Sequence, residues 1–156
     1  MRHAARPSYN DDMSDMSQSS GVDTSMGTRW SVGGLLLEAL AARDFDGMAD
    51  CFEPTAAMRA LLPPGLAECQ GADEIVDSLR SWFGGAEDFE VVDGTVGEIG
   101  GRVHVAWRLR MRPTPWGADA WHVIEQQAYL QAGERIAAID LLCSGFMLDT
   151  STRGSR

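Results

Sequence analysis

The sequence contains no lysine: all thirteen basic residues are arginine, against 23 acidic residues. The formal net charge of the 156-residue chain is therefore −10. Nucleic acids and anionic membranes are bound mainly by clustered Lys and Arg, so this charge disfavours both as partners. The sequence also lacks any apolar run near the roughly 20 residues that a membrane-spanning helix requires. We therefore expect no nucleic-acid partner and no membrane partner.

Cysteine and histidine are scarce, which limits disulfide and metal chemistry. The three cysteines, Cys51, Cys69 and Cys143, form no Cys-x-x-Cys pair, and the three histidines are widely separated. This spacing matches no metal motif, so we expect no metal, no cofactor and reduced thiols. The N-terminal region lacks the apolar stretch of about 7–15 residues that a secretion signal needs. We expect a cytoplasmic protein.

Composition divides the chain into one domain and two tails. The stretch from Ser8 to Thr28 consists mainly of Ser, Asp, Gly and Met, and it cannot bury enough surface to offset its chain entropy. We expect residues 1–28 and 151–156 to be disordered tails and residues 29–150 to form one domain. A chain of this size can bury roughly two thirds of the surface that it exposes when unfolded.

Apolar residues recur at helical spacing in three segments of the first half of the chain. The first segment runs from Trp30 to Arg43. The second has Asp46 as its expected N-cap and ends before Pro54, because proline cannot continue a helix. The third follows Gly71 and carries acidic residues in its first turn, where the helix dipole favours them. These patterns predict three helices.

The apolar period then changes to 2, which is typical of β-strands. Four extended segments separated by short loops are expected at Phe89–Ile99, Arg102–Arg112, Asp119–Gln131 and Arg135–Leu148. Strands joined in order by short loops form an antiparallel meander, and a short extra strand is expected at Ala57–Leu62. Helices followed by strands predict an α+β domain with the helices on one face of the sheet.

Three stretches resemble the nuclear-transport-factor-2-like superfamily in its SnoaL-like branch: Leu36–Phe52, Gly71–Ile75 and Gly133–Ile139. The likeness covers about residues 30–148. It implies a cone-shaped fold in which three N-terminal helices pack on a curved antiparallel four-stranded meander with a short extra strand. In that family helices and sheet enclose a mostly apolar pocket. Members include ketosteroid isomerases, epoxide hydrolases, dehydratases and polyketide cyclases, as well as dimers without catalysis.

The catalytic residues of these enzyme classes are absent from the matching positions. The isomerase-like members have a carboxylate after the second helix, where this sequence has Ala57–Ala60, and a Tyr on the first helix, which here has none. The epoxide-hydrolase-like Arg-x-Asp is replaced by Arg108–Arg110, and Ala41 stands near the position of the dehydratase-like Asp. The resemblance therefore implies a fold and a pocket but does not select a reaction.

Alternation along the strands limits which side chains can face such a pocket. On the second strand the apolar set within Val103–Met111 should face the helices, which leaves His104 and three arginines on the outer face. The third strand has two mixed sets, and which one faces inward stays open. One set is Trp121, Val123, Glu125, Gln127 and Tyr129, and the other is Ala120, His122, Ile124, Gln126, Ala128 and Leu130.

Carboxylates and imidazole are the usual side chains of acid–base catalysis. We predict Glu125 or Asp140 as the general acid or base, assisted by His122 or Gln127. An ionised carboxylate in a dry pocket is costly, and its pKa would rise there. The alternative for Asp140 is an outward side chain paired with an arginine of the outer face.

Aromatic and apolar walls suit a small hydrophobic ligand. We predict such walls at Trp107, Trp121, Tyr129, Phe83 and Met58, with Gln127 as a polar ligand contact; the alternative is that these side chains fill the core. The predicted function is handling of a small hydrophobic molecule in an enclosed pocket, by cofactor-free acid–base catalysis of the cyclase, isomerase, dehydratase or epoxide hydrolase type. The alternative is a non-catalytic ligand- or protein-binding module. A homodimer through the outer sheet face is also expected.

Overall fold

The computed structural model describes residues 24–151, with side chains from Arg29 onward, and all but two of its strands follow the last helix. The elements in order are α1 (Thr24–Ala42), α2 (Phe45–Met48), a 3-10 turn (Ala49–Cys51), β1 (Phe52–Leu62), β2 (Gly65–Gln70), α3 (Ala72–Phe83), β3 (Asp88–Ile99), β4 (Arg102–Arg112), β5 (His122–Ala132), β6 (Ile136–Cys143) and β7 (Met147–Leu148).

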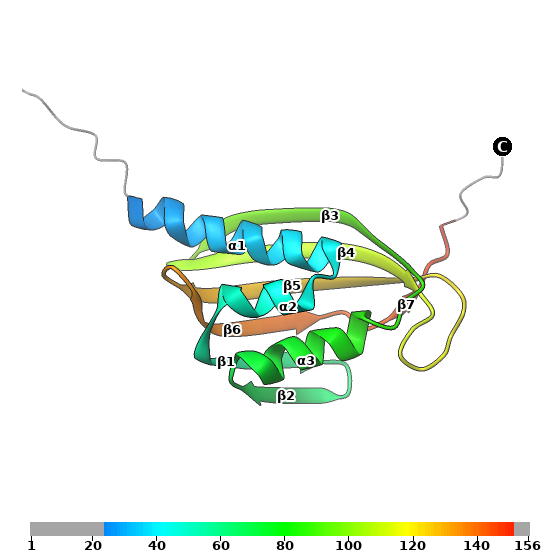
Figure 1. The fold of residues 1–156 in the computed structure, drawn as a ribbon. Coiled ribbons are helices and arrows are strands. Elements are labelled where there is room, and N and C mark those ends of the chain that lie inside the picture. The colour runs from blue at the N-terminus through cyan, green and yellow to red at the C-terminus, as the bar shows by residue number, and fades with distance from the viewer. Residues whose placement is uncertain (1–23, 152–156) are drawn as a thin grey trace, which may run out of the picture.

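The strands form one sheet in the order β2-β1-β6-β5-β4-β3, and the short β7 pairs with the beginning of β5. Neighbouring strands are antiparallel except for β1 and β6, which are parallel. Figure 1 shows the three helices on one side of the curved sheet, with the β4–β5 loop and β7 together at the end opposite the start of α1. The expected α+β architecture, with β3 to β6 as a meander, is confirmed.

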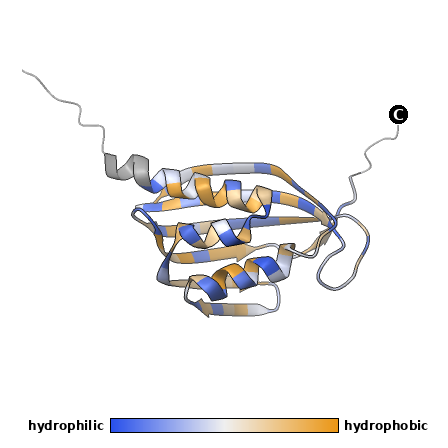
Figure 2. Ribbon diagram, in the orientation of Figure 1, coloured by the Kyte–Doolittle hydropathy of each residue, from blue (hydrophilic) through white to orange (hydrophobic). Residues whose placement is uncertain are grey.

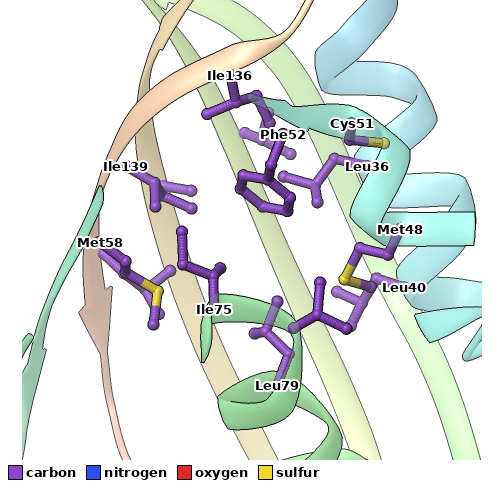
Figure 3. Close-up of a cluster of buried hydrophobic side chains, with 14 of the residues drawn as sticks. Leu36, Leu40, Met48, Cys51, Phe52, Met58, Ile75, Leu79, Ile136 and Ile139 are labelled. Carbon is purple, nitrogen blue, oxygen red and sulfur yellow. The ribbon is translucent and has the colours of Figure 1, made fainter. Parts of the chain in front are cut away.

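The core lies between the helices and the inner face of the sheet. Every second residue of β4 from Val103 to Met111 is buried there, as the alternation predicts. The α3 stripe of Ile75, Leu79 and Phe83 belongs to the same buried core, and Figure 3 shows Ile75 and Leu79 within it. Figure 2 shows apolar segments recurring along helices and strands. Burying each such side chain contributes about 1.5–3 kcal/mol, so this layer is the main source of stability.

The N-terminal boundaries differ from the sequence expectation. Helix α1 begins at Thr24, inside the range expected as a tail; residues 1–23 and 152–156 lie outside the described part of the chain. The N-cap of α2 is Asp44, whose Oδ1 accepts a hydrogen bond from the Gly47 backbone N–H at 2.9 Å. Asp46, the expected cap, lies in the first turn instead.

The second helix is shorter than expected because the chain extends before Pro54. Strand β1 starts at Phe52, which is buried and pairs with Ile136 of β6. A shift of register between Phe52 and Ala57 leaves Pro54 in an irregular stretch, where its missing N–H costs no ladder hydrogen bond. The adjacent β2 is an additional edge strand. Within residues 24–151 no helix combines the length and apolarity needed to span a bilayer.

Candidate functional site

The structure decides which set of β5 side chains faces inward. Ile124, Gln126, Ala128 and Leu130 are buried beneath the helices, whereas the alternate residues, including Glu125, point to the open face of the sheet. Since the two sets lie on opposite sides of the backbone, the predicted site residues of β5 are divided between two surfaces.

Both predicted catalytic carboxylates lie on the open face and pair with arginine. The Arg108 Nε atom donates to Glu125 Oε1 at 2.6 Å. Asp140 is held by two arginines, with Arg59 Nε at 2.8 Å from Oδ1 and Arg102 Nη1 at 2.6 Å from Oδ2. The hydrogen bond from Arg59, and then that from Arg102, keep the pKa of the Asp140 carboxyl below its ordinary value despite some desolvation. The outward, arginine-paired alternative for Asp140 is the one observed.

Three of the predicted ligand-contacting residues also lie on the open face. The Tyr129 hydroxyl donates to Gln127 Oε1 at 3.2 Å, and the Tyr129 ring lies 5.0 Å from that of His104. The Trp121 ring stacks with the guanidinium groups of Arg110 and Arg112, at 4.5 and 5.0 Å. These contacts form a polar and aromatic surface rather than the wall of a pocket.

Two further predicted wall residues face inward but belong to the packed core. Met58 of β1 and Trp107 of β4 are almost fully buried. Figure 3 places Met58 among Ile75, Ile139 and their neighbours under α3. The hollow that the fold was expected to enclose is filled at this position by buried side chains of β1, β6 and α3.

A cavity of about 690 Å³ remains at one end of the domain. It lies where the β1–β2 turn, the end of α3, the β4–β5 loop, the start of β5 and the segment after β6 meet, at the end of Figure 1 that carries β7. Its walls are mainly apolar and include Leu62, Pro63, Trp82, Phe83, Trp116 and Phe146. Of the predicted site residues, it brings together Phe83 and His122.

The β4–β5 loop and the segment after β6 supply an aromatic pair at the cavity. The Thr114 N–H donates to the Ala118 carbonyl at 3.1 Å, and the Gly117 N–H donates to the Thr114 carbonyl at 2.9 Å, which closes the loop around Trp116. The Trp116 and Phe146 rings meet edge to face with centroids 5.0 Å apart. Trp116 is 75% exposed, so much of its surface is open to solvent.

His122 has a defined hydrogen arrangement at this cavity. Its Nδ1 atom lies 2.7 Å from the carbonyl oxygen of Ala120. A carbonyl oxygen can only accept, so Nδ1 carries the hydrogen and the neutral ring keeps its lone pair on Nε2. An imidazole oriented in this way by the backbone is suited to accept a proton.

The segment after β6 is hydrogen-bonded to β5 at two places. Ser144 and Glu125 exchange two hydrogen bonds of 2.9 Å, and the Asp149 N–H donates to the Trp121 carbonyl at 2.9 Å. Gly145 has φ of +79°, and a Cβ there would lie 2.6 Å from the Pro63 ring. Only glycine combines this backbone conformation with such a close approach.

Sequence reasoning missed several groups that line the cavity: Gln126, Cys143, Thr114, Trp82, Trp116 and Phe146. The inward-facing set of β5 residues contains both His122 and Gln126. Knowing which set faces inward would therefore have identified Gln126 from the sequence. The two loop aromatics lie outside any periodic segment, and no pattern pointed to them. In the part of the chain that the structure describes, no group of three potential ligands is placed to hold a metal ion.

The hollows on the open face are smaller than this cavity. One beside Arg108 and Glu125 measures about 90 Å³, and another beside Leu61, Gln127 and Leu142 measures about 380 Å³. Since one water occupies about 30 Å³ in the liquid, the first hollow holds only a few solvent molecules. The second lies along the exposed leucines of β1 and β6.

A family model for the SnoaL-like domain matches residues 35–137. The chain belongs to this family. No curated protein matches the sequence. Solved structures with the same fold include a candidate polyketide cyclase from Xanthomonas campestris pv. campestris, with a TM-score of 0.60 and 14% identity over 74% of this SnoaL-like chain and 90% of that chain. The expected membership of the nuclear-transport-factor-2-like superfamily is thereby confirmed.

Two further structures show the same fold at low sequence identity. A phenazine biosynthesis-related protein from Pseudomonas aeruginosa has a TM-score of 0.59 at 10% identity, over 79% of this chain and 85% of that chain. A candidate ketosteroid isomerase from Kribbella flavida has a TM-score of 0.57 at 12% identity, over 76% of this chain and 78% of that chain. At these identities the likeness establishes the fold alone.

The stability of the fold should depend on pH through Asp149, which directly follows β7. Hydrogen bonds from the side chain and backbone of Ser151, and then from Arg110, lower the pKa of Asp149 from 3.8 to about 2. This ionised carboxylate therefore stabilises the fold above about pH 4, and its contribution is lost as the pH falls through about 2. We expect Asp149→Asn to lower the thermal unfolding midpoint near neutral pH, with the difference from wild type vanishing at about pH 2.

The control for this experiment is Glu53→Gln, because Glu53 is exposed at the irregular start of β1. Its unfolding midpoint should follow that of wild type throughout the titration. A difference between Asp149→Asn and wild type that stays constant down to the lowest pH would contradict the electrostatic account.

Proposed function

We propose that this chain binds a small, neutral, hydrophobic molecule in the cavity at the end of the sheet, and that His122 acts there as the acid–base group. The observation that carries the proposal is the cavity itself, of about 690 Å³. Small-molecule sites usually measure about 300–1,000 Å³ and combine apolar walls with a few polar groups. The cavity has this composition, with aromatic side chains around His122 and Gln126.

The choice of His122 follows from the separation of the two sheet faces. Glu125 and Asp140 lie across the sheet from the cavity and are paired with arginine, so neither reaches a bound molecule. His122 lines the cavity and presents a lone pair on Nε2. This arrangement supports proton removal from carbon next to a carbonyl: the C–H electrons form an enolate, and the imidazolium later returns a proton.

The structural neighbours agree with the proposed class of ligand. Their names refer to polyketide, phenazine and ketosteroid chemistry. Cyclisation, isomerisation, dehydration and epoxide opening are all compatible with an apolar cavity that holds one acid–base group. The second candidate function is binding without catalysis, which is favoured because no Asp or Glu is among the described residues that line the cavity with His122.

Ligand binding is tested by filling the cavity. The probe is 2-acetonaphthone, a neutral two-ring ketone. Cys143 lines the cavity, so the indole of Cys143→Trp should occupy the space. This variant should raise the dissociation constant about tenfold or more, which is equivalent to about 1.4 kcal/mol of binding free energy. Its neighbour Leu142 faces the opposite side of β6, so Leu142→Trp should leave the affinity unchanged. Equal binding by both variants, measured by calorimetry, would place the probe elsewhere.

Catalysis is tested by exchange of the methyl protons of the same ketone in D₂O, followed by NMR. Wild type should exchange them faster than buffer, and His122→Gln should slow the protein-catalysed rate by roughly 100-fold because the base is lost. His104→Gln is the matched control, since His104 lies on the open face beside Tyr129. Binding without any exchange would favour the non-catalytic module, and full exchange by His122→Gln would remove His122 from the chemistry.

We further propose that the open face of the sheet pairs with a second copy of the chain. Leu66, Leu61 and Leu142 occupy directly paired positions on β2, β1 and β6, and they are 63%, 53% and 46% exposed. An exposed apolar row of this kind gains free energy when it is covered, and closed dimers are the commonest assemblies. The arginines beside it already pair with carboxylates, so dimerisation need not bury an unpaired charge.

The dimer proposal predicts the effect of one charge in the middle of this row. Wild type should sediment as a dimer at micromolar concentration, and Leu61→Glu should shift it to monomer, because the new carboxylate has no partner in the interface. Leu35→Glu is the control, since Leu35 is similarly exposed but lies on α1, on the other side of the molecule. A wild-type protein that sediments as a monomer would refute the proposal.

A further inference from the structure

Gln126 is the one buried amide side chain on the inner face of β5. It is 2% exposed and lies between Ile124 and Ala128, in a layer that is otherwise apolar. A buried carboxamide is costly unless its oxygen and nitrogen both find partners. The positions of the amide oxygen and the amide nitrogen of Gln126 therefore indicate which kind of group the cavity can bind.

Trp107 determines which end of the Gln126 carboxamide faces the core. The two residues are directly opposite each other on β4 and β5, and the Trp107 Nε1–H donates to Gln126 Oε1 at 3.0 Å. An indole N–H can only donate, so the atom that it meets must be the amide oxygen. If the carboxamide were rotated by half a turn, two donors would face each other.

The Gln126 nitrogen is left pointing away from this contact. It makes no hydrogen bond to another residue of the described chain. Among residues 29–151, whose side chains the structure describes, no fully enclosed side-chain nitrogen or oxygen lacks a partner, so this nitrogen keeps some accessible surface. The inner side of β5 opens on the cavity, which Gln126 lines together with His122.

Three other polar side chains around the cavity use their hydrogens on the backbone. The Ser81 hydroxyl donates to the Ser78 carbonyl at 2.7 Å, and the Ser144 hydroxyl donates to the Gly145 carbonyl at 2.9 Å. His122 donates through Nδ1 to Ala120. Gln126 differs from these three because its donor is both uncommitted and fixed in direction by a buried partner.

We propose that Trp107 is a positioning residue that fixes the Gln126 amide N–H groups as donors toward the cavity, so that the cavity selects apolar molecules carrying a carbonyl oxygen. This inference rests on the proposed ligand cavity and names the class of ligand: neutral ring-containing ketones, esters or quinones. A hydrocarbon of the same shape offers these amide hydrogens no acceptor. Such unpaired donors are a strong source of discrimination between otherwise similar ligands.

The test compares two probes of nearly equal shape, 2-acetonaphthone and 2-isopropenylnaphthalene, in which a CH₂ group replaces the carbonyl oxygen. Wild type should bind the ketone about tenfold more tightly, by calorimetry or quenching of tryptophan fluorescence. Trp107→Phe keeps an aromatic ring but lacks the N–H, so the carboxamide is free to rotate. We expect this variant to lose the preference while its affinity for the hydrocarbon stays the same.

Gln126→Met is the second variant, since it keeps the length of the side chain and removes both amide groups. It should also lose the preference, and the double variant with Trp107→Phe should show no further change, because both substitutions act through one amide. Gln126→Met therefore tests the ligand-facing donor even if Trp107→Phe does not fold. Circular dichroism checks the folding of each variant.

The outcomes separate this inference from the proposed function. Equal binding of the two probes by wild type would overturn the carbonyl selectivity and leave the cavity as a ligand site. A preference that Gln126→Met removes but Trp107→Phe retains would overturn the positioning role of Trp107. Failure of wild type to bind either probe would overturn the proposed function and the inference with it.

Discussion

The alternation of side chains along β5, with helices covering one face of the sheet, is the constraint on which the functional architecture depends. It places His122 and Gln126 on the inner side and Glu125, Gln127 and Tyr129 on the outer side. A shift of register by one residue would exchange the two sets completely. The buried ladder of Ile124, Ala128 and Leu130 prevents such a shift, because it would expose three apolar side chains and bury charged and polar ones. Core packing therefore fixes the chemistry of both surfaces.

Polar side chains on the two faces of the sheet are satisfied by different kinds of partner. On the open face, carboxylates pair with guanidinium groups of neighbouring strands, and solvent screens these charges. On the inner face, each polar group has a specific partner: the Trp107 indole orients Gln126, and the Ala120 carbonyl orients His122. The inner arrangement leaves defined donor and acceptor positions facing an apolar space. Such preorganised groups are what recognition and proton transfer require.

The fold could be predicted from sequence further than the site. The stripes of α3 and the alternation of β4 report directly on burial, so the layers and the meander followed from them. The resemblance carried by Leu36–Phe52 and two shorter stretches placed the chain in its superfamily. The boundary at Phe52 was harder, because its spacing from Phe45 continues a helical face, while pairing with Ile136 draws it into the sheet. Both sets of β5 mixed polar and apolar residues, so sequence alone could not orient His122, and Trp116 belongs to a loop without periodicity.

We propose that a small apolar molecule enters the inner cavity and not the open face. NMR mapping of the isotope-labelled protein during titration with 2-acetonaphthone distinguishes the two surfaces. We expect the largest shifts at the Trp82 indole, the Gln126 side-chain amide and the Phe146 backbone, all at the cavity, with Tyr129 and His104 unchanged. Shifts concentrated at Tyr129, His104 and Leu142, with none at Gln126, would contradict it.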